Sequence, residues 1–250
     1  MKLTGKVALI SGLGNRFGKA AALLMAKEGA KLAMIARSTG TLNDVADQIK
    51  AEGGQALIFE ADSTVSNDVK TIISDVASHY GNIHILLNNA GGNYTKHEKL
   101  HEFSENKWNE IISNNLKSVF LFSKYCIPIM IEQGGGSIIN VSAAAKTLQD
   151  GNCAYATSKM GVIGLTRNLA REYSKMNIRV NCVCPGVIRH DAKNYKSLQN
   201  IEYRLWKTGQ SEDVAQSICF FASDASCWIT SQTLSIDGGE ENFISIPKPS

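Results

Sequence analysis

The stretch Val7-Ala-Leu-Ile-Ser-Gly-Leu-Gly-Asn-Arg-Phe-Gly18 joins a short apolar run to a glycine-rich turn, and a helical pattern follows over residues 16–28. An apolar run of this length is typical of a strand buried on both faces of a parallel sheet. A glycine-rich turn between a first strand and its helix lets backbone N–H groups and the helix dipole meet a pyrophosphate. A tight turn with no ligand is the alternative interpretation. The stretch therefore indicates the first strand and helix of a nucleotide-binding sheet.

The alternation of apolar runs with helical patterns continues along the whole 250-residue chain. Strands are expected at residues 7–10, 31–36, 56–60, 83–88, 137–141, 179–183 and 233–236. Helices are expected at residues 16–28, 41–52, 67–79, 105–132, 154–175 and 212–223, with Ser66, Ser104 and Ser211 as N-caps. No repeat or Pro/Gly-rich linker divides the chain, so residues 1–250 are expected to form one domain. Strict alternation implies right-handed crossovers and a doubly wound α/β sheet with helices on both faces.

Composition argues against several classes of protein. The formal net charge of +3, with Lys and Arg scattered along the chain, is too small to indicate a nucleic-acid partner. The six cysteines show no paired spacing and Cys182-Val-Cys184 is not a metal knuckle, so no metal site is expected. The cysteines look like reduced thiols, so we expect the protein in the reducing cytoplasm. The N-terminus lacks the apolar core of a signal peptide, and no apolar run approaches the roughly 20 residues of a membrane-spanning helix.

The second expected strand ends in Ala36-Arg37-Ser38. Proteins that bind NAD usually place an acidic residue here to hold the ribose 2′-hydroxyl. This chain has no acid at that point, and Arg37 can pair with a 2′-phosphate through charge-assisted hydrogen bonds. The pattern favours NADP over NAD, and a merely solvated Arg37 is the alternative.

Polar residues follow the third and fourth expected strands. Asp62 comes just after the third strand, and Asn88-Asn-Ala-Gly91 closes the fourth. Both would lie at the carboxyl edge of a doubly wound sheet, where ligands bind. Ordinary turn chemistry is the alternative, because Asn, Asp and Gly are common in turns.

Tyr155 and Lys159 lie four residues apart in an expected helix, so they point the same way about one turn apart. An ammonium group beside a phenol favours the ionised phenol and lowers its pKa. The result is an acid/base group whose proton can move near neutral pH, as the reduction of a carbonyl requires.

Taken together, these motifs resemble those of the short-chain dehydrogenase/reductase family over essentially the full chain, and within it those of 3-oxoacyl-carrier-protein and pteridine reductases. The resemblance rests on Ser11–Gly18, Asp62, Asn88–Gly91, Asn115, Tyr155-x-x-x-Lys159, Pro185-Gly186 and Asp237-Gly-Gly239. It implies a Rossmann-type fold with seven parallel strands, a nicotinamide dinucleotide and a small carbonyl or alcohol substrate. It also implies a homotetramer or homodimer formed through the helices at 105–132 and 154–175.

The resemblance assigns roles to individual residues. Tyr155 would donate the proton, Lys159 would hold the nicotinamide ribose and acidify Tyr155, and Asn115 would keep a water in a proton relay. Ser142 is the candidate that would polarise the carbonyl. The residues expected to hold NADP are Gly12, Gly14, Asn15, Arg16, Phe17, Gly18, Arg37, Asp62, Ser63, Asn89, Ala90, Gly91, Tyr155, Lys159, Pro185, Gly186 and Ile188.

Two departures from the family pattern bear on activity. Arg16 stands where the family has a glycine that lets the backbone approach the phosphates, so it crowds the turn or reaches outward as a further phosphate or substrate contact. The catalytic serine is ambiguous: counting back from Tyr155 gives Ser142, whereas counting forward along the strand gives Ala143. A one-residue slip in a strand exchanges its faces, although a bulge could still present Ser142.

Residues 186–210 are expected to form a lid or rim over the substrate. Residues 186–208 contain more Lys and Arg than Asp and Glu, which suggests an anionic substrate, although a solvated helical surface explains the same charges. The main hypothesis is an NADP-dependent oxidoreductase. The alternative is a cofactor-binding sensor or scaffold with little turnover, because a fold alone does not guarantee chemistry.

Overall fold

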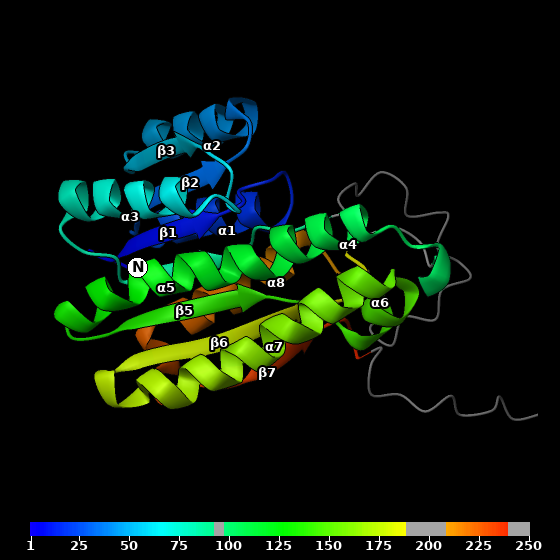
Figure 1. Cartoon of the computed structure of the whole chain (residues 1–250). Coiled ribbons are helices and arrows are strands. Elements are labelled where there is room, and N and C mark those ends of the chain that lie inside the picture. Colours follow the sequence, from blue (N-terminus) through cyan, green and yellow to red (C-terminus); the bar gives the residue numbers. More distant parts are fainter. Residues whose placement is uncertain (93–97, 189–208, 240–250) are drawn as a thin grey trace, which may run out of the picture.

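The computed structural model describes residues 1–92, 98–188 and 209–239, and within them it contains one seven-stranded sheet (Figure 1). All the strand pairs are parallel, in the order β3-β2-β1-β4-β5-β6-β7. The strands are β1 (Val7–Ser11), β2 (Lys31–Ala36), β3 (Ala56–Glu60), β4 (Ile85–Asn88), β5 (Gly136–Val141), β6 (Ile178–Pro185) and β7 (Thr233–Ile236). The predicted seven-stranded parallel sheet is confirmed.

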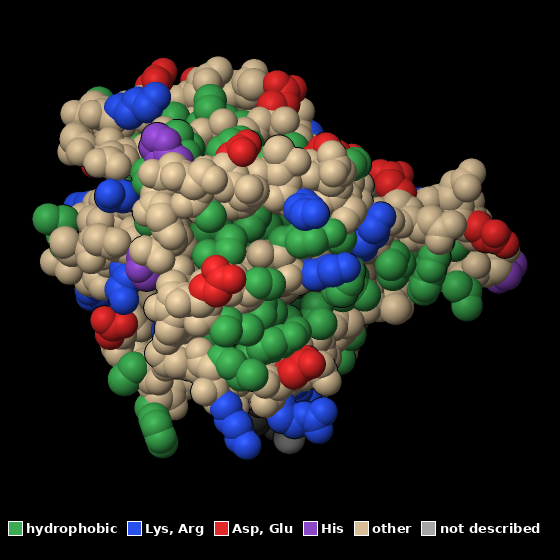
Figure 2. All heavy atoms as spheres, turned by 60° about the vertical axis from the view of Figure 1, so that its left-hand side comes forward, with side chains coloured by type: hydrophobic (Ala, Val, Ile, Leu, Met, Phe, Trp, Pro, Cys, Tyr) green, Lys and Arg blue, Asp and Glu red, His purple; other side chains and the backbone are tan. Residues whose placement is uncertain are grey.

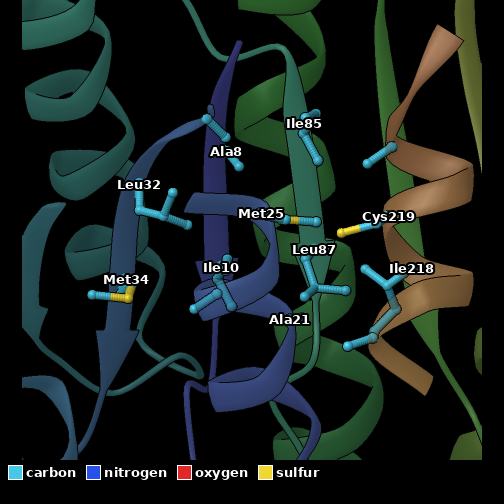
Figure 3. Packing of buried hydrophobic residues seen from close by; sticks show 14 of the residues in the cluster. Ala8, Ile10, Ala21, Met25, Leu32, Met34, Ile85, Leu87, Ile218 and Cys219 are labelled. Atoms are coloured by element: carbon cyan, nitrogen blue, oxygen red, sulfur yellow. The ribbon is translucent and has the colours of Figure 1, made fainter. Parts of the chain in front are cut away.

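Helices cover both faces of the sheet, because each central strand is apolar on both sides. The helices are α1 (Phe17–Lys27), α2 (Thr39–Ala51), α3 (Ser66–Tyr80), α4 (Glu105–Ile112), α5 (Ser118–Glu132), α6 (Ala145–Asp150), α7 (Cys153–Tyr173) and α8 (Ser211–Ala222). Ala8 and Ile10 of β1 pack against α1, α2 and α8, whereas Val7 and Leu9 pack against α3, α5 and α7. Figure 3 shows Met25 of α1 and Cys219 of α8 pointing toward each other over β4.

The strand order reverses direction at β1, which pairs with β2 on one side and with β4 on the other. Connections from these neighbouring strands run to opposite faces of the sheet and leave a crevice at the carboxyl edge. The loops after β1, β4 and β5 therefore meet at one place. This is the edge at which the sequence motifs are expected to converge.

The predicted helix at 105–132 is interrupted in the structure. Residues Ser113–Lys117 form a π-helical turn between α4 and α5. At this turn Asn115 Nδ2 donates to the Ile111 carbonyl at 2.9 Å, an oxygen that in a regular helix would accept the backbone N–H four residues on. Single π turns of this kind occur inside α-helices and are frequent at functional sites.

The helix starts differ from prediction at two of three positions. Ser104 caps α4 as expected, because its Oγ accepts a hydrogen bond from the Lys107 N–H at 3.3 Å. The assignments of Ser66 and Ser211 as N-caps were wrong, since both are first helical residues and Val65 and Gln210 occupy the cap positions. At α8, a reciprocal capping box between Gln210 and Asp213 supplies the missing hydrogen bonds.

The predicted lid at 186–210 lies mostly outside the described residues, which resume at Gly209 after Ile188.

The helix α6 at Ala145–Asp150 was not predicted. None of the helices in the described ranges is both long and apolar enough to cross a membrane.

Candidate active site and coenzyme groove

Two adjoining cavities lie at the carboxyl edge of the sheet and share the glycines of two loops. The first, of about 230 Å³, runs from the end of β2 to the loop after β4. The second, of about 390 Å³, runs from the turn after β1 to the first turns of α7. The residues that line both cavities are Gly12, Gly14, Gly91 and Gly92. Together the cavities form one elongated groove, here called the dinucleotide groove.

Two glycines allow the backbones of this groove to come together. Gly12 has φ +67°, and a Cβ built on it would lie 2.3 Å from the Cα of Ala90. Gly91 has φ +153°, and its Cβ would lie 2.6 Å from Asn115 Oδ1 and 3.1 Å from Lys159 Nζ. Any side chain at position 91 would therefore fill the space between these two polar groups. The glycine-lined cradle fits a pyrophosphate lying close to backbone N–H groups.

The first cavity carries opposite charges on its two sides. Arg37 and Ser38 line it at the end of β2, and Asp62 and Ser63 line it after β3. The pKa of the Asp62 carboxyl is lowered mainly by a hydrogen bond from the Thr64 N–H at 2.8 Å, and further by the nearby charge of Arg37, against the opposing effect of burial. Asp62 is therefore a carboxylate at neutral pH, and Arg37 is an exposed cation. This end of the groove presents charged groups suited to the adenosine ribose.

The first turn of α7 is built by Asn152. Its side chain caps the helix by accepting the Tyr155 N–H at 2.8 Å, and it is fully buried. The Tyr155 side chain then packs in an apolar cluster with Ile111, Ala143 and Ala154, and it is only 8% exposed. Tyr155 also lines the second cavity. The cap and the cluster together hold the phenol at the wall of the groove.

Lys159 lies one turn further along α7, on the same face as Tyr155. Its Nζ lies 6.0 Å from the centroid of the Tyr155 ring and donates to the Val141 carbonyl at 2.9 Å. Burial lowers the pKa of the Lys159 amine to about 8, although the neighbouring Cys182 and Cys184 thiols favour its charged form. The ammonium is therefore present at neutral pH and is lost as the pH rises above about 8.

Asn115 links the π turn to the loop after β4. It is fully buried, and its Oδ1 accepts the Gly92 N–H while its Nδ2 donates to the Gly92 carbonyl, both at 3.0 Å. The side chain pins the glycine loop that forms the floor of the groove. Asn115 does not itself line either cavity, but its neighbour Asn114 lines the first.

Ser142 lines the second cavity, but its hydroxyl group points into the protein. The Oγ donates to the backbone carbonyl of Lys159 at 2.8 Å. Its one hydroxyl hydrogen is thus already used within the fold. Ala143 packs against Tyr155 in the apolar cluster described above.

Most of the sequence-predicted coenzyme residues lie along the dinucleotide groove. Those that line it are Gly12, Gly14, Asn15, Arg16, Phe17, Arg37, Asp62, Ser63, Asn89, Ala90, Gly91, Tyr155 and Lys159. Gly18 lies beneath the turn, where a Cβ would lie 1.9 Å from the Leu13 carbonyl oxygen. Pro185 ends β6, and Gly186 and Ile188 follow it at the same edge, but these three residues do not line either cavity.

Sequence reasoning missed six groove residues, namely Leu13, Ala36, Ser38, Gly92, Asn114 and Val141. The pair Gly91-Gly92 was a usable signal, because two adjacent glycines after a strand indicate close backbone approach. Asn114 and Val141 gave no comparable signal. Among the described residues, no cluster of three or more His, Cys, Asp or Glu side chains could hold a metal ion.

Comparison with known proteins assigns the chain to one family. Residues 6–200 match the model of the short chain dehydrogenase family. The chain is 37% identical over 247 residues to the 3-oxoacyl-[acyl-carrier-protein] reductase FabG of Thermotoga maritima, covering 96% of this chain and 99% of that protein. It is 35% identical over 246 residues to the reductase of the same name from Staphylococcus aureus, with the same coverage.

Solved structures give the same result. Levodione reductase superposes with a TM-score of 0.87 at 29% identity and covers 96% of this chain and 98% of its own. A short-chain type dehydrogenase/reductase from Mycobacterium marinum superposes with a TM-score of 0.87 at 33% identity, covering 95% of this chain and 96% of its own. The chain belongs to the short-chain dehydrogenase/reductase family. It is therefore an oxidoreductase of the class that acts on carbonyl or alcohol groups with a nicotinamide coenzyme.

Proposed function

We propose that this protein transfers a hydride between NADPH and a carbonyl or alcohol substrate, with Tyr155 as the acid/base. The observation that carries this proposal is the continuous groove with Arg37 at one end and the Tyr155–Lys159 pair at the other. A dinucleotide laid along the groove would place its adenosine ribose near Arg37 and its nicotinamide near Tyr155. The glycines shared by both cavities would then lie beside the pyrophosphate.

The coenzyme supplies the hydride, and the residues of the chain supply position and a proton. Tyr155 would donate its hydroxyl hydrogen to the carbonyl oxygen as negative charge develops there. Lys159 would keep the phenol acidic through its positive charge, and it would hold the nicotinamide ribose by turning from the Val141 carbonyl. Asn115 would hold the loop at Gly92 and keep a water for proton return.

The proposal is tested by following NADPH oxidation over a panel of ketones and aldehydes, with NADPH affinity measured separately by fluorescence titration. Turnover with at least one carbonyl class supports the enzyme. Tight NADPH binding without turnover on any carbonyl would instead support the alternative of a sensor or scaffold, which Arg16 and the ambiguous serine suggest.

We further propose that Ser142 does not polarise the carbonyl, because its hydroxyl hydrogen is donated to the Lys159 carbonyl. Ala143 would then stand in the position of the family serine, and the site would lack one donor. Removing such a donor from other enzymes costs about 10²–10³-fold in rate. Ser142→Ala is expected to change kcat/KM for reduction less than about threefold, and Ala143→Ser to raise it about tenfold or more.

Ala143→Gly is the control for the serine test, since it alters packing without adding a hydroxyl. Melting temperatures of all three variants separate folding from catalysis. If kcat/KM fell about 10²-fold or more in a fully folded Ser142→Ala variant, Ser142 would be the polarising donor after all.

We propose that the protein forms a homo-oligomer through the outer faces of α5 and α7. A groove of about 570 Å³ runs between these helices, lined by Phe120, Ile127, Ile131, Leu165 and Leu169 among others. Phe120 is 46% exposed and Ile131 is 41% exposed, and hydrophobic side chains gather on this face (Figure 2). Monomeric proteins rarely leave a contiguous apolar patch of this kind uncovered.

The oligomer proposal is tested by light scattering on the wild type and on Phe120→Lys. A dimer or tetramer is expected for the wild type, with a smaller species for the variant, because a lysine would be desolvated in the interface. Ile58→Lys, at a similarly apolar position on the far edge strand β3, should leave the wild-type mass unchanged. A monomeric wild type at micromolar concentration would contradict the proposal.

We place the protein in the cytoplasm. All six cysteines carry free thiols, including the exposed Cys227. Exposed thiols persist in reducing compartments and are oxidised or paired elsewhere.

A further inference from the structure

Arg16 occupies an unusual place in the dinucleotide groove. It is the residue immediately before α1, and it lines the same cavity as Tyr155 and Lys159. Its backbone is anchored, because the Arg16 carbonyl accepts the Ala20 N–H at 3.2 Å. Its side chain is exposed, and none of the ion pairs formed within the described residues involves it. The guanidinium is therefore available to a ligand in this cavity.

The part of the cavity wall that the structure describes is positively charged. Among the described lining residues, Arg16 and Lys159 are basic and none is Asp or Glu. The neighbouring Asn15 differs from Arg16, because its Oδ1 accepts a hydrogen bond from Thr41 Oγ1 at 2.9 Å and is held toward α2. A wall that presents an arginine and a lysine, with no carboxylate among its described residues, attracts an anionic ligand.

A coenzyme pyrophosphate already has partners in this groove without Arg16. The N–H groups of the first turn of a helix have no acceptor within that helix, and Gly12 and Gly14, which line this groove before α1, let the backbone approach a phosphate. These N–H groups and the helix dipole are suited to the pyrophosphate. The guanidinium of Arg16 is then available to bind a second anion. A guanidinium binds a carboxylate or phosphate through two parallel hydrogen bonds.

We propose that Arg16 binds an anionic group of the substrate, so that the enzyme prefers carbonyl compounds that carry a carboxylate or a phosphate. This inference rests on the proposed carbonyl chemistry at Tyr155. Arg16 orients the substrate through its anionic group, and Tyr155 receives the carbonyl oxygen. Neutral carbonyl compounds of the same size enter the cavity but lack this anchor.

The test compares each member of a series of oxo-carboxylates of increasing chain length with its methyl ester, and adds dihydroxyacetone phosphate against dihydroxyacetone. The wild type is expected to prefer the anion of at least one pair. In Arg16→Gln, the ratio of kcat/KM for that anion to its neutral partner should fall about 10- to 100-fold, the usual effect of losing a charged hydrogen bond. Lys19→Gln is the matched control, because Lys19 is a cation of α1 that does not line the cavity, and it should leave the ratio unchanged.

The same variants are titrated with NADPH by fluorescence, which measures the contribution of Arg16 to coenzyme affinity without turnover. An Arg16→Gln variant that loses activity equally on anion and neutral partner, with weakened NADPH affinity, would assign Arg16 to the coenzyme phosphates and overturn the inference. A wild type that reduces both members of every pair equally would also overturn it, while the proposed function stands. Failure to reduce any carbonyl would overturn the proposed function itself.

Discussion

Tyr155→Phe is expected to lower the rate of carbonyl reduction by about 10²–10⁴-fold, the usual contribution of a positioned acid. The substitution removes one oxygen and keeps the ring, which packs with Ile111, Ala143 and Ala154. Folding and NADPH affinity should therefore change little. The measurements are steady-state kcat and kcat/KM with the best carbonyl substrate, and NADPH titration by fluorescence.

Tyr173→Phe is the matched control, because Tyr173 lies at the other end of α7 and outside the dinucleotide groove. It should retain wild-type kinetics. If Tyr155→Phe kept its activity within a few-fold of the wild type, the proton would have to come from another group, and the role proposed for Tyr155 would be wrong.

Arg37→Asp is expected to shift the coenzyme preference from NADPH toward NADH by about 10²-fold or more. The change removes a cation that can pair with the 2′-phosphate and places a negative charge opposite that phosphate. It also restores an acid that can accept the ribose 2′-hydroxyl of NAD. Because Arg37 is exposed, the fold should tolerate the change.

The preference is measured as the ratio of kcat/KM for the two coenzymes, together with their dissociation constants. Arg37→Gln, which removes the cation without adding an anion, should give an intermediate ratio. An unchanged ratio in Arg37→Asp would identify Arg37 as a solvated surface residue and would leave the coenzyme preference to other groups.

The sheet was predictable because each buried strand is identified by the apolar residues of its own short segment. The run at Val7–Ser11 is buried on both faces, so apolar residues alone identify it, and the same holds for β2 and β6. The groove was predictable for the same reason, since parallel strands bring the ends of β1, β2 and β4 to one edge. Glycines after β1 and β4 indicated where the backbone comes close to a ligand.

The features that sequence could not supply depend on contacts between distant residues. At the π turn Ser113–Lys117, Asn115 bonds to Ile111 and to Gly92, and the second contact joins segments 23 residues apart. The roles of Ser142 and Ala143 depended on where a loop had lost one residue, which spacing alone leaves open. The direction of the Ser142 hydroxyl, toward the Lys159 carbonyl, is visible only once α7 lies against β5.

A crystal structure of the NADPH complex with a bound carbonyl substrate, trapped in the Tyr155→Phe variant, tests the central claim most directly. The account predicts that the nicotinamide C4 lies within about 3–3.5 Å of the carbonyl carbon, the usual separation of reacting atoms. It also predicts that the ring edge of residue 155, from which the wild-type hydroxyl projects, faces the carbonyl oxygen. A nicotinamide ring turned away from residue 155, or lying outside the groove, would contradict it.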